Sequence, residues 1–176
     1  EGGMRVPFIA AWVKANEKND HQQRLPIVSG TLQKQSAAVY DLFPTILELV
    51  SADPIPEGHE IDGSRLNSLL TGKPDTGRKD AFLMHYPHGP HRSNYFTTYR
   101  EGDWKVIYHY LPGEDSEGAR YQLFNLEKDP FEQNDLAEKE PQVLKRMMTT
   151  LAEGLTKQSA QYPVDEEGKP LLPQVP

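Results

Sequence analysis

The clearest alternation of apolar and polar residues lies between Ala81 and Tyr110. Ala81–Tyr86 is a short run rich in β-forming residues, which predicts a strand. Residues 95–100 and 104–110 flank Glu101-Gly102-Asp103, and the glycine can adopt positive φ. These segments therefore predict a hairpin with a three-residue turn, in which alternate residues from Trp104 to Tyr110 share one face of the sheet.

Two segments carry apolar residues at helical spacing. After Asp41, a candidate helix cap, apolar residues recur through residues 42–50, and Pro44 is tolerated in a first turn. After Pro141, one helix face holds Val143, Met147, Leu151 and Leu155, reinforced by Leu144 and Met148. This second helix is expected to cover an antiparallel sheet formed by the segments above and a further strand at residues 121–126.

The first apolar segment, residues 6–13, is continuous rather than alternating. Continuous apolarity favours a strand buried on both faces, as in the parallel sheet of an α/β domain. Residues 14–35 are polar and predict a long surface loop, and the Pro/Gly-containing link 73–79 is a candidate boundary. The prediction is therefore the end of an α/β domain over residues 1–75. An antiparallel sheet with a covering helix and an extended tail follows over residues 76–176.

Composition narrows the function classes. The net charge of −7 argues against a nucleic-acid partner bound by bulk charge. There is no cysteine, so the segment has neither a thiolate metal site nor a cysteine nucleophile. No apolar run approaches the roughly 18 residues of a membrane span. The chain opens on Glu1-Gly2-Gly3 without an initiator methionine, and we expect it to be a piece of a longer protein.

A cationic cluster follows the first predicted strand. His85, His88 and His91 lie within seven residues and Arg92 comes next, while Pro and Gly at 87, 89 and 90 exclude a helix. The four side chains therefore lie on a loop leaving a strand end, where binding residues often occur. Imidazole and guanidinium groups attract anions, so we predict that these residues can form a local anion-binding pocket. The alternatives are a structural hydrogen bond from His85 to a backbone carbonyl and a zinc site built from the histidines.

Other polar and aromatic residues have simpler interpretations. His109 is expected to be structural on a sheet face, and His21 and His59 to be solvated. Lys105 is interpreted as a solvated strand lysine in preference to a cleft residue. Trp104 and the neighbouring tyrosines are expected in the sheet core rather than on a sugar-stacking surface, because their alternation matches a pleated strand.

Five short motifs follow one another along residues 1 to about 155. They are Glu1-Gly2-Gly3-Met4-Arg5-Val6-Pro7; Asp41-Leu42-Phe43-Pro44-Thr45; Asp62-Gly63 with Leu69-Leu70-Thr71-Gly72; His85-Tyr86-Pro87-His88 with residues 100–107; and residues 123–137, LFNLEKDPFEQNDLA. In this combination and order the chain resembles the C-terminal part of a type I sulfatase of the alkaline-phosphatase-like superfamily. Asp135 stands where that family usually has asparagine.

The resemblance implies a sulfuric ester hydrolase acting on a sulfated carbohydrate. It also implies that the substrate is bound by the residues of the cationic cluster, which are His85, His88, His91 and Arg92. It also implies that the formylglycine nucleophile, the calcium ligands and the catalytic lysine lie upstream, on an N-terminal catalytic part of the same protein. No catalytic or metal-binding residue is then expected in this segment, which alone is expected to be inactive. Family habit implies a periplasmic or secreted protein. The alternatives are a non-catalytic subdomain for assembly or carbohydrate binding, and part of a related phosphatase or phosphonate hydrolase.

Overall fold

The computed structural model describes residues 5–51, 58–87 and 94–176. These residues form two compact units. Val6–Lys79 make up one, and Asp80–Pro176 belong to the other. Each unit has its own secondary structure and is described separately.

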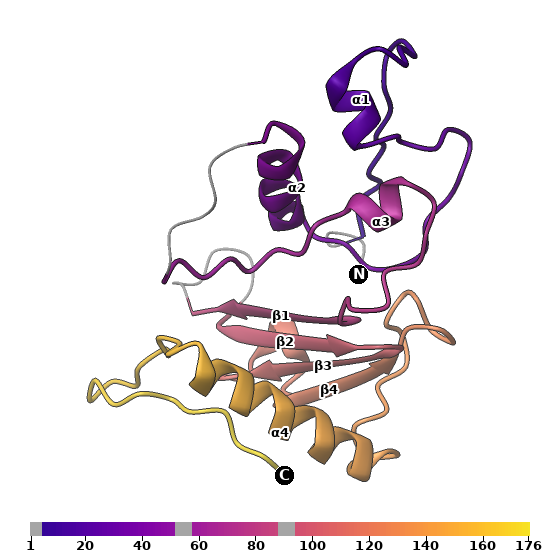
Figure 1. The fold of residues 1–176 in the computed structure, drawn as a ribbon. Helices are drawn as coiled ribbons and strands as arrows, with labels where there is room; N and C mark the ends of the chain where they lie inside the picture. Colours follow the sequence, from indigo (N-terminus) through magenta and orange to yellow (C-terminus); the bar gives the residue numbers. More distant parts are fainter. Residues whose placement is uncertain (1–4, 52–57, 88–93) are drawn as a thin grey trace. The chain divides into compact units, whose positions relative to one another are not determined.

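The second unit is built on a four-stranded antiparallel sheet in the order β1-β2-β3-β4 (Figure 1). The strands are β1 (Ala81–Tyr86), β2 (Phe96–Glu101), β3 (Trp104–His109) and β4 (Tyr121–Asn125). Each strand pairs with the next one along the chain, and a short 3-10 helix, η2 (Glu114–Ser116), lies in the connection from β3 to β4. The predicted antiparallel sheet is confirmed, and the structure adds the order of its strands.

One helix, α4 (Pro141–Lys157), lies across one face of this sheet (Figure 1). Pro141 occupies its first turn, where a missing amide hydrogen costs nothing. Its buried face packs against Tyr99, Val106, Tyr108 and Leu123, which the strand register places on the same side of the sheet; the helix contributes Leu144, Met147, Met148, Leu151 and Leu155. The predicted helix, its apolar face and its position over the sheet are confirmed, as is the core role of the tyrosines.

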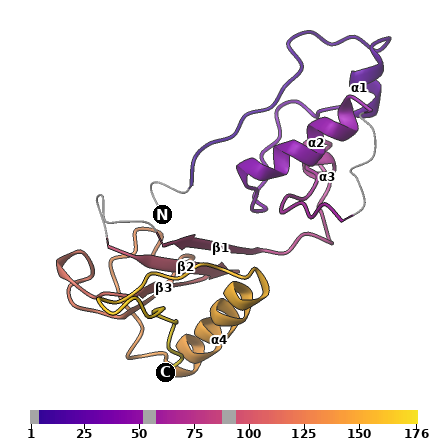
Figure 2. The ribbon, with the colours of Figure 1, turned by 90° about the vertical axis from the view of Figure 1, so that its left-hand side faces the viewer.

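The chain after α4 turns back beside the sheet (Figure 2). An isolated bridge pairs Val164 with Pro170, and Leu171 donates a backbone hydrogen bond to Pro163. Tyr108 and Tyr121 donate hydroxyl hydrogen bonds to the carbonyls of Leu172 and Gln174, at 3.4 and 3.1 Å. The predicted extended tail is therefore attached to the sheet by side chains of two different strands.

The Val6–Lys79 unit contains short helices joined by irregular chain. They are α1 (Asp20–Arg24), η1 (Val39–Asp41), α2 (Leu42–Leu49) and α3 (Asn67–Leu70). The helix predicted after Asp41 is present as α2, but Phe43, Ile46 and Val50 are about half exposed. The predicted loop over residues 14–35 is interrupted by α1, whose first turn is closed by the side chain of Asn19 accepting from the Gln22 amide.

Two predictions are corrected by the structure. Residues 6–13 form no strand, and Ile9 is 89% exposed and Val13 fully exposed. A strand needs a hydrogen-bonding neighbour, and the strands of the described residues all pair within the sheet of the other unit. The β2–β3 turn has two residues instead of three, because Glu101 pairs with Trp104 and only Gly102, at φ +57°, and Asp103 lie between them.

Candidate functional site

His85 lies on β1, facing the side of the sheet that carries α4. Its Nε2 lies 2.6 Å from the carbonyl oxygen of Gln161, which can only accept, so Nε2 carries the proton. In the neutral ring, Nδ1 then accepts from the Thr97 hydroxyl, also at 2.6 Å. The rings of Tyr110 and Tyr162 meet the imidazole edge-on at centroid distances of 6.0 and 5.8 Å. His85 thereby connects β1 to β2 and to the chain following α4.

Tyr110 extends this polar chain into the core. Its hydroxyl lies 3.0 Å from Thr97 Oγ1, and the residue is 2% exposed. Burial raises the pKa of Tyr110 well above its ordinary value, so the phenol stays protonated across the physiological range. The hydrogen bonds of the Tyr110–Thr97–His85 chain are therefore suited to holding backbone segments in place.

The other predicted substrate residues, His88, His91 and Arg92, lie outside the described residues. Their predicted role, and that of His85 toward a substrate, stays a prediction. The zinc alternative also involves the undescribed part of the loop. Within the described ranges, no group of three or more histidine, aspartate or glutamate side chains is placed to hold a metal ion.

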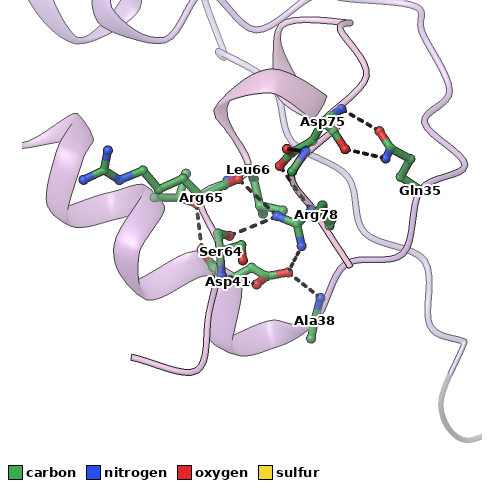
Figure 3. Close-up of polar contacts among 10 residues, drawn as sticks. Gln35, Ala38, Asp41, Ser64, Arg65, Leu66, Asp75 and Arg78 are labelled. Atoms are coloured by element: carbon green, nitrogen blue, oxygen red, sulfur yellow. Dashed lines mark hydrogen bonds and ion pairs between the residues drawn. The ribbon is translucent and has the colours of Figure 1, made fainter. Parts of the chain in front are cut away.

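A buried ion pair organises the Val6–Lys79 unit (Figure 3). Asp41 is 2% exposed, and its Oδ2 accepts from Arg78 at 2.7 Å and from the Ala38 amide at 2.8 Å. Its Oδ1 accepts from the Ser64 amide at 2.7 Å. Asp41 thus does not cap α2 with its side chain, as its position before the helix had suggested. The carboxylate instead draws three separate segments together.

Arg78 completes this network from residues 73–79, the last segment of the same unit. Its guanidinium donates to the carbonyls of Ser64 and Arg65 at 3.0 and 3.1 Å, and its Nε lies 3.5 Å from Asp75 Oδ2. Asp75 in turn exchanges two hydrogen bonds with the side chain of Gln35 (Figure 3). The network therefore holds residues 73–79 against two other segments. These segments, residues 41–45 and 62–72, carry the second and third sequence motifs.

Those two motifs also meet through Thr45 and Gly63. The Thr45 hydroxyl donates to the carbonyl of Asp41 at 2.6 Å and accepts from the Leu66 amide at 2.9 Å. A Cβ added at Gly63 would lie 2.3 Å from the carbonyl oxygen of Tyr40, so only glycine fits this approach. The aspartate, threonine and glycine of these motifs are explained by packing rather than by chemistry on a substrate.

A second buried ion pair joins the last two motifs. Lys105 on β3 is 3% exposed, and its Nζ lies 2.5 Å from Glu132 Oε1. Glu132 adopts φ +57°, a conformation that is unfavourable for a residue other than glycine. The interpretation of Lys105 as a solvated lysine is therefore wrong, because its charge is buried and paired. The sequence pattern did not indicate Glu132 as the partner of Lys105, because the two residues are 27 positions apart.

Two of the remaining histidines agree with their predicted structural or solvated roles. His109 is 7% exposed, and its Nε2 lies 2.9 Å from Gln122 Oε1 on the neighbouring strand. His59 is exposed. His21 is also exposed, but its Nδ1 lies 3.1 Å from the carbonyl of Leu49, so it has a protein partner in addition to solvent.

Comparison with known proteins shows that the sequence motifs lie within a match to a known protein family. Residues 1–161 match the family model described as N-sulphoglucosamine sulphohydrolase, C-terminal. The chain is 26% identical over 163 residues to the N-acetylgalactosamine-6-O-sulfatase of Bacteroides thetaiotaomicron, covering 86% of this chain and 27% of that protein. It is 36% identical over 86 residues to human steryl-sulfatase, covering 49% of this chain and 12% of that protein.

Solved structures show the same fold. A protein solved in complex with its substrate D-glucosamine-2-N,6-O-disulfate superimposes with a TM-score of 0.53 at 24% identity, over 68% of this chain and 24% of that one. A 2-O glycosaminoglycan sulfatase gives a TM-score of 0.51 at 20% identity, over 68% and 24%. The chain spans about a quarter or less of the length of these relatives.

Proposed function

Because the chain belongs to the N-sulphoglucosamine sulphohydrolase C-terminal family, we propose that it is the C-terminal part of an enzyme that hydrolyses sulfate esters of carbohydrates. The family match over residues 1–161 carries this proposal. The carbohydrate substrate is supported by relatives whose names specify sulfated sugars.

The catalytic groups in this proposal lie on another part of the protein. Sulfatases of this family use formylglycine and calcium, and within the described residues no metal-binding cluster occurs. The chain also has no cysteine from which formylglycine could be made. In this proposal, the segment contributes a scaffold and contacts to the substrate. The proposed location of the complete enzyme is the periplasm or the outside of the cell.

Exposed apolar side chains support a catalytic partner part within the same protein. In the Val6–Lys79 unit, large apolar residues that their sequence pattern marks as core are more than half exposed; they are Val6, Phe8, Ile9, Val13, Phe43, Ile46 and Val50. Large exposed apolar surface of this kind marks an interaction site. The proposed occupant is the upstream part, which supplies the neighbouring strands that residues 6–13 lack here.

Substrate contact is proposed for the stretch of sequence that begins at His85 on β1 and includes His88, His91 and Arg92. The support is chemical, since imidazole and guanidinium groups bind sulfate and sugar hydroxyl oxygens. Both ring nitrogens of His85 already have protein partners. The main role of His85 is therefore to fix the end of β1. Direct contacts with the substrate are assigned to His88, His91 and Arg92.

Alanine substitution in the complete enzyme tests this assignment. We expect His88→Ala and Arg92→Ala each to lower kcat/KM for the sulfated sugar by on the order of tenfold, because a hydrogen bond to a charged group contributes about 1.5–3 kcal/mol. Turnover of a small aryl sulfate should change by less than about twofold, since it makes no contact with the loop. The exposed His59→Ala serves as the matched control. Equal losses on both substrates would remove the loop from substrate selection.

A further inference from the structure

A cavity of about 350 Å³ is lined by residues of the sheet and of the chain that follows α4, all within the Asp80–Pro176 unit. We propose that this cavity binds an oxyanion, and sulfate in preference to a carboxylate. Tyr108, Tyr110 and Arg120 line it from the side of the sheet. The other lining residues belong to the returning chain and include Asp165, Lys169 and Leu172.

The guanidinium of Arg120 is the group in this cavity that points to an anion. It is half-buried, and none of the ion pairs of the described residues involves it. Its two protein hydrogen bonds, to the hydroxyl of Tyr108 and the carbonyl of Tyr110, both come from Nη1, at 3.3 Å. The N–H groups of Nε and Nη2 are therefore left for a ligand. Two oxygens of a sulfate or a carboxylate match such a pair of parallel donors.

Arg120 is held in place before any ligand binds. Tyr108 is 1% exposed, and the guanidinium carbon of Arg120 lies 6.0 Å from the centre of its ring. The Tyr108 hydroxyl accepts from Arg120 and donates to the carbonyl of Leu172 at 3.4 Å. One buried side chain thus connects the cation to the returning chain. A donor group that is arranged in advance lowers the entropy cost of binding.

The turn that carries Lys169 is also fixed. Val164 forms a bridge with Pro170, and the Asp165 amide donates to the Lys169 carbonyl at 3.0 Å. The Asp165 carboxylate accepts from the amides of Glu167 and Lys169 at 3.0 and 2.8 Å. The turn therefore keeps its shape, and it places a second cationic side chain at the cavity.

Charge favours a dianion in this cavity. The lining residues include two cations, Arg120 and Lys169, and one carboxylate, Asp165. The net charge of the lining is therefore positive, and two backbone amides already bind Oδ1 of the carboxylate. Sulfate carries two negative charges and acetate carries one, so the lining attracts sulfate more strongly.

Binding is tested with inorganic sulfate and with acetate, each against chloride at matched ionic strength. The backbone amide signals of Lys169 and Leu172 in nitrogen–proton correlation NMR spectra of the 176-residue chain report on the site. We expect a saturable shift with sulfate at a Kd on the order of 1 mM. Acetate should bind about threefold or more weakly, and chloride should give no saturable shift.

Three substitutions locate the site. Arg120→Lys keeps the charge but removes the paired donors, and should weaken sulfate binding at least about tenfold. Lys169→Gln changes an exposed side chain and should weaken it about threefold. Asp165→Asn should tighten it, because the amide oxygen still accepts the hydrogen bonds of the turn while the negative charge is lost. Lys145→Gln, at an exposed position of α4, is the matched control and should change nothing.

No saturable shift with sulfate, or unchanged sulfate binding by Arg120→Lys, would overturn the inference. Equal weakening by Lys169→Gln and by the control would also overturn it, since it would show a general effect of surface charge. Acetate that binds as tightly as sulfate would overturn the charge argument, as would weaker binding by an Asp165→Asn variant with a native far-UV circular dichroism spectrum. The inference is independent of the proposed function, because these measurements involve no turnover.

Discussion

The carboxylate of Asp41 shows how a single charge can determine a local fold. It is almost completely buried and accepts three hydrogen bonds, from Arg78 and from the amides of Ala38 and Ser64. Each donor comes from a different part of the chain. A buried charge is tolerated only while its partners remain, so the network is sensitive to removal of any one of them.

Removing Arg78 tests this sensitivity. Arg78→Met should lower the free energy of unfolding by about 3–5 kcal/mol, because it leaves the carboxylate of Asp41 buried without its countercharge. The matched control is Arg65→Met, since Arg65 pairs with Glu48 on the surface with a side chain 66% exposed. That change should cost less than about 1 kcal/mol. Urea unfolding measures both, and similar small losses would show that the network is not the organising contact.

Tyr99 provides a pH-dependent prediction. Burial, and secondarily the carboxylate of Glu101 at 3.3 Å, raise the pKa of Tyr99 to about 12 from 10.0. The folded state therefore holds this proton more tightly than the unfolded state. The resulting stabilisation is complete below pH 10 and is lost as pH rises through 12.

The measurement compares Tyr99→Phe with the parent chain. Between pH 9 and pH 11.5 the parent should lose more unfolding free energy than the variant, which lacks the titrating phenol. Tyr110 contributes to both proteins and cancels in the difference. An identical loss in the two proteins would contradict the raised pKa of Tyr99.

The residue types of the sequence indicated where polar and charged side chains gather, but they did not indicate the hydrogen-bond or ion-pair partners of those side chains. The cluster at His85 was evident from composition, but its bond to Gln161 joins residues 76 positions apart. The same holds for Lys105, which meets Glu132 across 27 positions, and for Arg78, which meets Asp41 across 37. Local patterns contain no information on such distant pairs.

At the scale of elements, α4 depends on one apolar face. Leu151 is fully buried among strand residues and neighbouring helix positions, whereas Lys145 is exposed. Leu151→Ala should lower the free energy of unfolding by about 2–5 kcal/mol through lost burial and the cavity left behind. Lys145→Ala should change it by less than about 0.5 kcal/mol. Comparable effects of both changes, measured by denaturant unfolding, would contradict packing of α4 on the sheet.

The elements differ in how far the sequence determined them. The bounds of β1 and the apolar face of α4 agree with prediction because their partners lie in the same unit. Residues 6–13 have an equally strong apolar pattern but form no strand. A pattern indicates what a segment can bury, and the strand forms only where a neighbour supplies the hydrogen bonds. The helix α2 forms without such a neighbour, but the apolar residues Phe43, Ile46 and Val50 of this segment are likewise about half exposed.

At the scale of the whole molecule, the two units differ in how much apolar surface their residues bury. The Asp80–Pro176 unit contains a core of ten buried residues formed by the sheet and α4. The Val6–Lys79 unit is held by polar networks and exposes large apolar residues. No helix within the described residues is long and apolar enough to cross a membrane. The exposed apolar residues of the Val6–Lys79 unit agree with the proposal that this segment packs against a larger catalytic part.

The central claim is that this segment assists a sulfatase whose reactive groups lie on the rest of the protein. Hydrolysis of an aryl sulfate should be measured for the 176-residue chain and for the complete protein at matched concentration. We expect turnover by the complete protein and none above background by the chain. Turnover by the chain itself, or a correctly folded complete protein without sulfatase activity, would contradict the claim.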